Sequence, residues 1–448
     1  MSPVLTAAAV PVEAVGAGAT AWVLAATALV ALMVPGIALL YGGMVSSRNV
    51  LGMLMQSLVT AAAVGVAWIL VGYSLAFGST GPLIGDLSLL GLTGLDSPVA
   101  GLEGTAAGAL PPPVHAAFQL MFAVVTAVLI LGSTADRWRF GAFLPFMLIW
   151  PVLVYAPVAH WVFAPDGWAA RSGALDFAGG TVVHVNAGAA ALAMAVVLGR
   201  RRGWPESTPR PHSLPFVVLG AALLWVGWIG FNAGSAYGVG SVAGYALLNT
   251  HAGAAAGLFG WAVVERMRVG KVTTLGAASG VVAGLVAVTP CAGYVPPLAA
   301  LAVSAVAGAL CAVAVALTAR FGIDDALDVV GVHLVAGIVG SLGVGLFASV
   351  AINPDGADGL FAGGDYALLG MQALTVLAVA AYSFGATFLI GSVLDRIVGN
   401  RVTPAAERMG LDLALHGESA YVTDVPMVAR HQAAPPQAAP HQHAGDRS

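Results

Sequence analysis

Charged residues are scarce in this chain of 448 residues, at 8% of the sequence. An ordinary soluble protein is about one quarter charged, and those charges help to cover its surface. Hydrophobic residues make up 59% of the chain, and the mean hydropathy is +0.90. So few charges cannot cover a soluble fold of this size, so the composition predicts a protein embedded in a lipid bilayer.

Lysine and cysteine are almost absent as well. The single lysine, Lys271, and a formal net charge of −4 exclude the basic surface that nucleic-acid binding requires. The two cysteines, Cys291 and Cys311, both lie within apolar runs. They therefore indicate neither a disulfide framework nor a zinc site.

Apolar runs long enough to cross a bilayer recur along the chain. A spanning helix needs about 20 apolar residues. The sequence contains eleven such runs, at 20–42, 50–78, 113–133, 140–164, 177–199, 213–236, 241–264, 272–292, 295–319, 328–352 and 367–394. The weakest breaks between them, 236–240 and 293–296, are short and uncharged. We predict an all-α integral membrane protein with eleven transmembrane helices.

The charges between these runs fall into two sets if the runs alternate in direction. One set holds all but one of the 17 Lys and Arg residues, and it comprises the loops near 46–49, 134–139, 200–212, 265–271 and 320–327 and everything after residue 394. The other set has only Arg171 as a basic residue but carries several acidic ones. Basic loops stay in the cytoplasm. The N-terminus is therefore predicted outside and the C-terminus inside.

This topology divides the chain into four segments: a short external tail over 1–19, a transmembrane domain over 20–394, a cytoplasmic regulatory tail over 395–430 and a terminal segment over 431–448. The terminal segment is mostly Ala, Pro, Gln and His without an apolar period. Such a segment cannot bury a core, and we expect it to be disordered.

A short motif occurs twice in the transmembrane domain. Residues 183–188 and 332–337 both read V-H-[VL]-x-A-G, and an aspartate stands eight residues before each histidine: Asp176 before His184, and Asp325 before His333. The copies lie in the fifth and the tenth apolar runs. Because five is odd, two five-helix halves, about 20–199 and 213–352, would have opposite orientations. This pattern predicts an inverted repeat with its site near the midplane, and the run 367–394 is an extra helix.

Ionisable side chains inside a span are costly, so each is a candidate for function. His184, His333 and His251 all lie within predicted runs. Residues related by a two-fold axis can meet, so we expect His184 and His333 to approach each other. Such a pair can ligate haem or a metal, relay protons, or line a pore for a small polar solute. Metal is disfavoured because no third ligand stands nearby in the sequence.

Aromatic residues recur at helical spacing near the predicted outer ends of two spans. Trp228, Phe231 and Ser235 share one helical face, and Phe118 and Phe122 share another. Such stripes are most often packing surfaces. Aromatic rings beside a hydroxyl can also bind a cation, by cation–π attraction and a hydrogen bond.

At this point the motifs resemble those of the ammonium transporter family, the Amt/Mep/Rh superfamily, in its bacterial Amt branch. The matching segments are 35–43 (PGIALLYGG), 173–184 (GALDFAGGTVVH), 230–235 (GFNAGS), 289–294 (TPCAGY), 328–333 (DVVGVH), 410–412 (GLD) and 416–421 (HGESAY). They cover about residues 20 to 422 in order. The resemblance implies a homotrimer with one pore per subunit, and a cytoplasmic face on which PII-type signalling proteins can dock.

The resemblance also assigns roles to single residues. It implies that His184 and His333 are the twin histidines of the pore, that Phe122 and Phe231 form a phenylalanine gate, and that Trp228 belongs to the pore wall. It matches Phe118 and Ser235 to the outer ammonium-recruitment site. Asp176 corresponds to an aspartate of structural or electrostatic importance beneath that site.

One position departs from the family pattern. The outer-site tryptophan appears here as Phe163, two residues after Trp161. Trp is a stronger cation–π partner than Phe. Either Phe163 serves the site more weakly, or Trp161 substitutes for it through a shifted helix end.

The resemblance implies a multi-pass transporter of the cell membrane, with no cofactor and no enzymatic activity. We expect ammonium to be recruited at the outer site and deprotonated, so that ammonia crosses an apolar pore, with its proton passing through the histidine pair. Three alternatives remain open at this point. The chain can be an ammonium sensor of the same fold, an electroneutral channel for ammonia or carbon dioxide, or a haem-binding redox enzyme.

Overall fold

The computed structural model describes residues 16–79, 81–206 and 210–421. Within these ranges the chain is helical, and it has no strand, only one isolated antiparallel bridge between Trp138 and Arg401. Most of the predicted external tail, the end of the predicted regulatory tail and the whole segment 431–448 lie outside the described residues.

The first half of the chain contains α1 (Ala17–Ala31), α2 (Met33–Met44), α3 (Val50–Ala67), η2 (Trp68–Gly72), α4 (Tyr73–Phe77), η3 (Leu90–Leu92), η4 (Ala100–Leu102), α5 (Pro112–Thr134), α6 (Phe140–Trp150), η5 (Pro151–Tyr155), α7 (Ala156–Phe163), α8 (Trp168–Arg171), η6 (Gly180–Val185) and α9 (Asn186–Leu198). The second half contains α10 (Leu214–Gly234), α11 (Ser241–Val269), α12 (Thr274–Val288), α13 (Pro297–Arg320), η7 (Val330–Leu334), α14 (Val335–Phe347), η8 (Leu360–Ala362), α15 (Tyr366–Ile397), α16 (Pro404–Met409) and α17 (Leu411–His416).

Ten helical segments of the described chain are long and apolar enough to cross a membrane, and they coincide with ten of the eleven predicted runs. The remaining run, 272–292, contains the shorter apolar helix α12. This helix gives way to turns at Pro290, which has no backbone N–H to continue it. The chain is thus a multi-pass helical membrane protein, and the eleventh crossing stays a prediction.

Prolines also explain why several spans are divided into short elements. Pro35 has no N–H, and its ring clashes with the carbonyl of Ala31, where α1 ends. Pro157 likewise cannot bond to the carbonyl of Leu153, which lies in the π-helical turn η5. These breaks interrupt the hydrogen bonding without ending the span, which continues through Phe140–Arg171.

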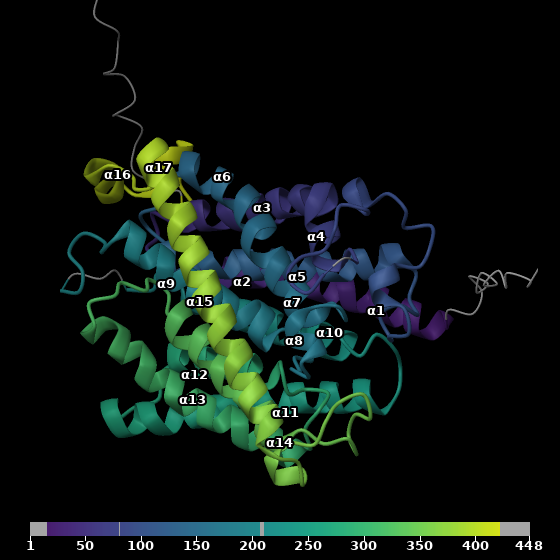
Figure 1. Ribbon diagram of the computed structural model, residues 1–448. Helices are drawn as coiled ribbons and strands as arrows, with labels where there is room; N and C mark the ends of the chain where they lie inside the picture. Colours follow the sequence, from purple (N-terminus) through teal and green to yellow (C-terminus); the bar gives the residue numbers. More distant parts are fainter. Residues whose placement is uncertain (1–15, 80, 207–209, 422–448) are drawn as a thin grey trace, which may run out of the picture.

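Glycines allow α11, α12 and α13 to pack closely. A Cβ atom on Gly257 would lie 2.4 Å from the Cα of Gly284, and one on Gly308 would lie 2.1 Å from the Gly257 carbonyl oxygen. Small residues at such crossings let helix backbones touch within a membrane. The long helix α15 crosses the outside of the bundle diagonally, with α16 and α17 near one of its ends (Figure 1).

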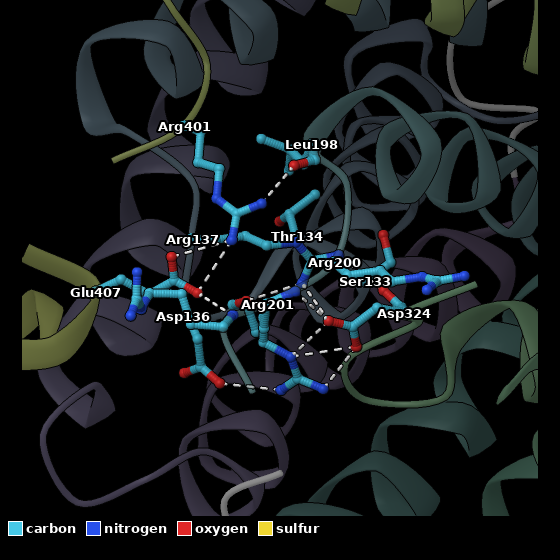
Figure 2. Close-up of polar contacts among 12 residues, drawn as sticks. Ser133, Thr134, Asp136, Arg137, Leu198, Arg200, Arg201, Asp324, Arg401 and Glu407 are labelled. Atoms are coloured by element: carbon cyan, nitrogen blue, oxygen red, sulfur yellow. Dashed lines mark hydrogen bonds and ion pairs between the residues drawn. The ribbon is translucent and has the colours of Figure 1, made fainter. Parts of the chain in front are cut away.

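A buried ionic cluster joins loops of the predicted cytoplasmic side (Figure 2). Arg201 bonds to Asp136 at 3.0 Å and to Asp324 at 2.8 Å, and Arg137 donates to the Asp324 carbonyl oxygen at 2.7 Å. Burial alone would raise the pKa of the Asp324 carboxyl. The hydrogen bonds and charge of Arg201 outweigh burial and lower that pKa below its usual value. The cluster therefore ties the loops after α5, α9 and α13 together.

The chain after α15 is bonded to the same side. Asp412 accepts hydrogen bonds from the backbone N–H groups of Leu51 and Gly52, at 3.0 and 2.8 Å. These are unpaired donors in the first turn of α3, so a residue some 360 positions away caps this helix. Arg401 pairs with Glu407 at 3.0 Å and donates to the Leu198 carbonyl oxygen at 3.1 Å.

Candidate functional site

The two histidines of the repeated motif meet in the middle of the bundle. His184 Nδ1 and His333 Nδ1 lie 3.2 Å apart, and the ring planes are inclined by 24°. Both side chains are buried. Two nitrogens at this distance share one hydrogen, so one ring donates and the other accepts. The contact also leaves no room for a haem macrocycle between the rings, so the residues do not fit the haem-binding alternative.

Aspartates hold the segments that carry these histidines. The two carboxylate oxygens of Asp176 accept hydrogen bonds from four successive backbone N–H groups, those of residues 179–182, at 2.7–3.1 Å. Asp325 Oδ2 accepts from the N–H groups of Val330 and Gly331, at 2.7 and 3.3 Å. The free donors at the start of η6 and of η7 are satisfied in this way, and a carboxylate there is also favoured by the helix dipole.

The glycine that ends each motif copy lets the two segments cross. A Cβ atom on Gly188 would lie 2.6 Å from the Leu334 backbone nitrogen, and one on Gly337 would lie 3.0 Å from the Gly180 carbonyl oxygen. Real Cβ atoms are essentially never found as close as the contact at Gly188, and the contact at Gly337 is tighter than most, so larger residues would push the segments apart. The motif thus supplies both the histidine and the close crossing that brings it to its partner.

Aromatic rings continue from the histidine pair toward the predicted outer side. The Trp228 ring stacks on His184 at 5.2 Å, and its Nε1 donates to Thr289 Oγ1 at 2.7 Å. The rings of Phe122 and Phe231 stack at 4.1 Å with an angle of 12°. Phe231 lies 6.2 Å from His184. The five predicted pore residues, His184 and His333, Phe122 and Phe231, and Trp228, therefore form one continuous column of rings.

A cavity of about 280 Å³ opens beyond this column, and we call it the outer vestibule. Phe163, Asp176 and Ser235 are among its lining residues. Ser235 Oγ donates to the Phe231 carbonyl oxygen at 2.9 Å, which leaves its lone pairs available to a ligand. Phe118 is fully buried and packs against Phe122 at 4.9 Å, behind the residues that line the cavity.

The two candidates for the missing outer tryptophan lie in different places. Phe163 lines the outer vestibule and meets the Phe122 ring edge to face at 6.3 Å. Trp161 instead packs against Tyr382 at 4.8 Å, and its Nε1 donates to the Leu83 carbonyl oxygen. Trp161 is not among the lining residues of the vestibule. Of the two, it is therefore Phe163 that can contact a solute there.

The predicted inner side of the histidine pair is much narrower. A cavity of about 30 Å³ borders His333 and is lined by Tyr41, Ser279 and Asp328, among others. Tyr41 donates its hydroxyl hydrogen to the Leu129 carbonyl oxygen at 3.2 Å. A space of this size holds little more than one small molecule. The column of rings thus ends in a narrow space next to acidic and hydroxyl groups.

Sequence reasoning missed several polar groups of the outer vestibule. His115, Gln119 and Tyr237 all line it. His115 is an ionisable residue within a predicted run, so the same argument that selected His184 applies to it. His251, in contrast, lies within α11 but has an exposed side chain. In the described ranges, no three His, Cys, Asp or Glu side chains are grouped closely enough to hold a metal ion.

A family profile described as the Ammonium Transporter Family matches residues 21–421. An ammonium transporter of Mycobacterium tuberculosis is 51% identical over 429 residues, with 90% of both chains covered. An ammonium transporter of Bacillus subtilis is 46% identical over 405 residues, covering 90% of this chain and 98% of the relative. The crystal structure of Candida albicans Mep2 superposes with a TM-score of 0.82 at 35% identity, covering 88% of this chain and 89% of that one.

Proposed function

This chain belongs to the Ammonium Transporter Family, and from this premise we propose that it moves ammonium across the cell membrane as ammonia plus a separately transferred proton. The observation that carries the proposal is the buried contact of 3.2 Å between His184 Nδ1 and His333 Nδ1, at the end of a column of aromatic rings. The steps follow from the polarity of each region along the column.

Ammonium is first held in the outer vestibule. The predicted external loops carry more acidic than basic residues, so they attract a cation. Phe163 offers a ring face, and Ser235 offers hydroxyl lone pairs. Phe118 contributes from behind by packing against Phe122. Cation–π attraction and one hydrogen bond offset part of the hydration that the ion loses. Asp176 supports this region through the backbone that it caps.

The column itself is unsuited to a bare cation. Phe122 and Phe231 are both fully buried and stacked, so an ion between them would lose its water with no polar group in return. The desolvation of a small ion costs several kcal/mol or more in such surroundings. Neutral ammonia loses far less. We therefore propose that ammonium gives up its proton before the Phe122–Phe231 pair, and that ammonia alone passes it.

The proton is transferred through the histidine pair. His184 lies nearer to Phe231, and His333 borders the inner cavities, so the pair runs from outside to inside. A proton arriving at His184 Nε2 lets the Nδ1 hydrogen pass across the shared hydrogen bond, and His333 then releases a proton on the inner side. The imidazole group suits such a relay because it donates and accepts near neutral pH. Trp228 keeps the His184 ring in place by stacking on it.

The homotrimer and the partner protein belong to the same proposal. Large apolar side chains of α11 and α13, such as Phe259, Met267 and Leu298, are exposed on the single chain and suit a lipid or subunit contact. On the predicted cytoplasmic side, the segment after α15 is bonded to α3 through Asp412. A PII-type signalling protein that docks there would contact this segment and the pore exit together.

The experiment is a rapid ammonium jump on proteoliposomes that contain only this protein. We expect a transient current that saturates with ammonium and is absent from empty liposomes. Silence from folded and inserted protein would contradict the proposal. In that case, a change of internal pH without current would indicate an electroneutral ammonia channel. Ammonium binding without any flux would indicate a sensor.

A further inference from the structure

A buried histidine that the transport steps above do not use lies at the edge of the outer vestibule. His115 stands in the first turn of α5 and is 1% exposed. Its Nδ1 lies 3.1 Å from the Tyr73 hydroxyl oxygen, and its ring packs between Phe77 at 4.8 Å and Tyr237 at 5.5 Å. These contacts hold the ring in place and engage one of its nitrogens. The other nitrogen, Nε2, has no hydrogen-bond partner in the part of the chain that the structure describes.

Gln119, one helical turn further along α5, repeats this arrangement. It is also 1% exposed and lines the vestibule next to His115. Its Nε2 donates to the Tyr237 hydroxyl oxygen at 2.5 Å, and its Oε1 finds no partner among the described residues. Buried polar atoms in proteins nearly always have a partner, and each one left without a partner requires an explanation. Here the two atoms belong to residues on one face of one helix, and both residues line the same cavity.

One of the two neutral tautomers of His115 gives the vestibule a further acceptor. If Nδ1 carries the hydrogen and donates it to the Tyr73 oxygen, Nε2 holds a lone pair. Gln119 Oε1 is an acceptor as well. Together with Ser235, the vestibule then offers three acceptors. A cation with several N–H donors can use all three acceptors. An alkali metal ion can coordinate the two oxygens, but the imidazole nitrogen is a poor ligand for it.

We propose that His115 Nε2 and Gln119 Oε1 form a hydrogen-bonding site for ammonium and primary alkylammonium ions in the outer vestibule, next to the aromatic rings and Ser235. This proposal rests on the proposed function, because it assumes that ammonium enters from this side. The site replaces part of the water that ammonium loses, and it favours N–H donors over alkali metal ions. Tyr73 is a positioning residue that keeps the lone pair of His115 on Nε2.

The test compares three substitutions of His115 in proteoliposome currents. In His115→Gln the side-chain amide reaches about the place of Nε2, whereas in His115→Asn it reaches only the place of Nδ1. His115→Leu removes both. We expect Leu and Asn to raise the half-saturating ammonium concentration by roughly tenfold, with little change in the limiting current. Gln should restore a value near that of the wild type.

The control is His251→Leu, the same change at an exposed position of α11. It should leave the half-saturating concentration unchanged. An unchanged value in folded His115→Leu, or equal values for the Gln and Asn variants, would overturn the proposal while leaving the proposed function intact. A wild type without ammonium flux would overturn the proposed function instead.

A second substitution tests Gln119 and leaves His115 unchanged. Gln119→Met keeps the length of the side chain and removes the acceptor, so a roughly tenfold rise is expected again. If the His115 variants fail to fold, Gln119→Met alone tests the proposed site. A wild-type half-saturating concentration in folded Gln119→Met would then overturn the site.

Discussion

The two copies of the histidine motif lie in unlike surroundings, although each carries an aspartate, a π-helical turn and a histidine in the same order. Asp176 uses both oxygens on four N–H groups, and it borders a vestibule of about 280 Å³. Asp325 uses one oxygen on two N–H groups, and Oδ1 has no partner in the described residues. The cavity at this end, which borders His333, is only about 30 Å³.

This difference separates what the motif fixes from what its surroundings add. The motif fixes the position of each histidine and the close crossing of the two segments. The loops around it decide whether an end has room to hold a solute. The outer end has room and three acceptors, which suits capture, whereas the inner end is narrow, which suits release. The local likeness of the two segments fits the predicted inverted repeat.

The most severe way to break this pair is to remove either ring. His184→Ala and His333→Ala should each reduce the ammonium-dependent transient current at least about a hundredfold, because one imidazole cannot pass a proton alone. The currents are measured in proteoliposomes with matched protein density. An ammonium-dependent proton movement equal to that of the wild type in either variant would contradict the relay. A steady cation leak through the widened pore would instead fit the loss of coupling.

The two aspartates should respond differently to the same isosteric change. In Asp176→Asn the NH₂ group faces two backbone N–H donors, so two hydrogen bonds are lost at a cost of about 2–4 kcal/mol. In Asp325→Asn the amide oxygen can still accept from Val330 and Gly331. The NH₂ group then occupies the place of Oδ1, which has no hydrogen-bond partner in the described residues. We expect only Asp176→Asn to lower the melting temperature in detergent strongly. Equal losses in the two variants would contradict this contrast.

Asp325 also predicts a pH dependence of stability. Burial raises the pKa of its carboxyl from 3.8 to about 6, although the backbone hydrogen bonds from Val330 and Gly331 act to lower it. A raised folded-state pKa means that the folded protein binds this proton more tightly than the unfolded chain does. Its stabilising contribution is therefore full below pH 4 and is lost as the pH rises through about 6.

Between pH 5 and 7 the wild type should lose about 1 kcal/mol relative to Asp325→Asn through this group. The difference in melting temperature between the two proteins, followed across that interval, measures the effect. A difference that does not change with pH, or that grows in favour of the wild type as pH rises, would contradict the raised pKa.

The smallest expected effect concerns ammonium binding in the outer vestibule. Phe163→Trp places a stronger cation–π partner against the vestibule, so the half-saturating ammonium concentration should fall by roughly threefold. The same current measurement checks it. Trp161→Phe is the matched control, because this residue packs against Tyr382 away from the cavity. A larger effect from Trp161→Phe than from Phe163→Trp would show that Trp161, and not Phe163, contacts ammonium.

Hydropathy was enough to predict the helices, because an apolar run of spanning length has few alternatives to a transmembrane helix. The internal repeat was enough to pair His184 with His333. The resemblance to the family was needed to pair Phe122 with Phe231, since spacing alone links only residues of one helix. The sequence alone left Phe163 and Trp161 as equal candidates. Both lie in the last turn of α7, and the packing of that turn decides which ring reaches the vestibule.

Other contacts could not be predicted from the local sequence. His115 is an ionisable residue near the start of a predicted run, but its position in the sequence does not show which cavity it lines. The bond from Arg201 to Asp324 joins residues 123 positions apart, and Asp412 caps a helix some 360 positions away. Such contacts arise from the packing of whole segments, which hydropathy and spacing do not describe.

The central claim is that ammonia and its proton cross together but by separate routes. The most direct test is the number of charges moved for each nitrogen transported, measured on the wild-type protein in the same proteoliposomes by parallel current and ¹⁵N-ammonium uptake. The account predicts a ratio of about one charge per nitrogen at every external pH at which transport occurs. A ratio near zero would contradict it, because nitrogen would then cross without its proton.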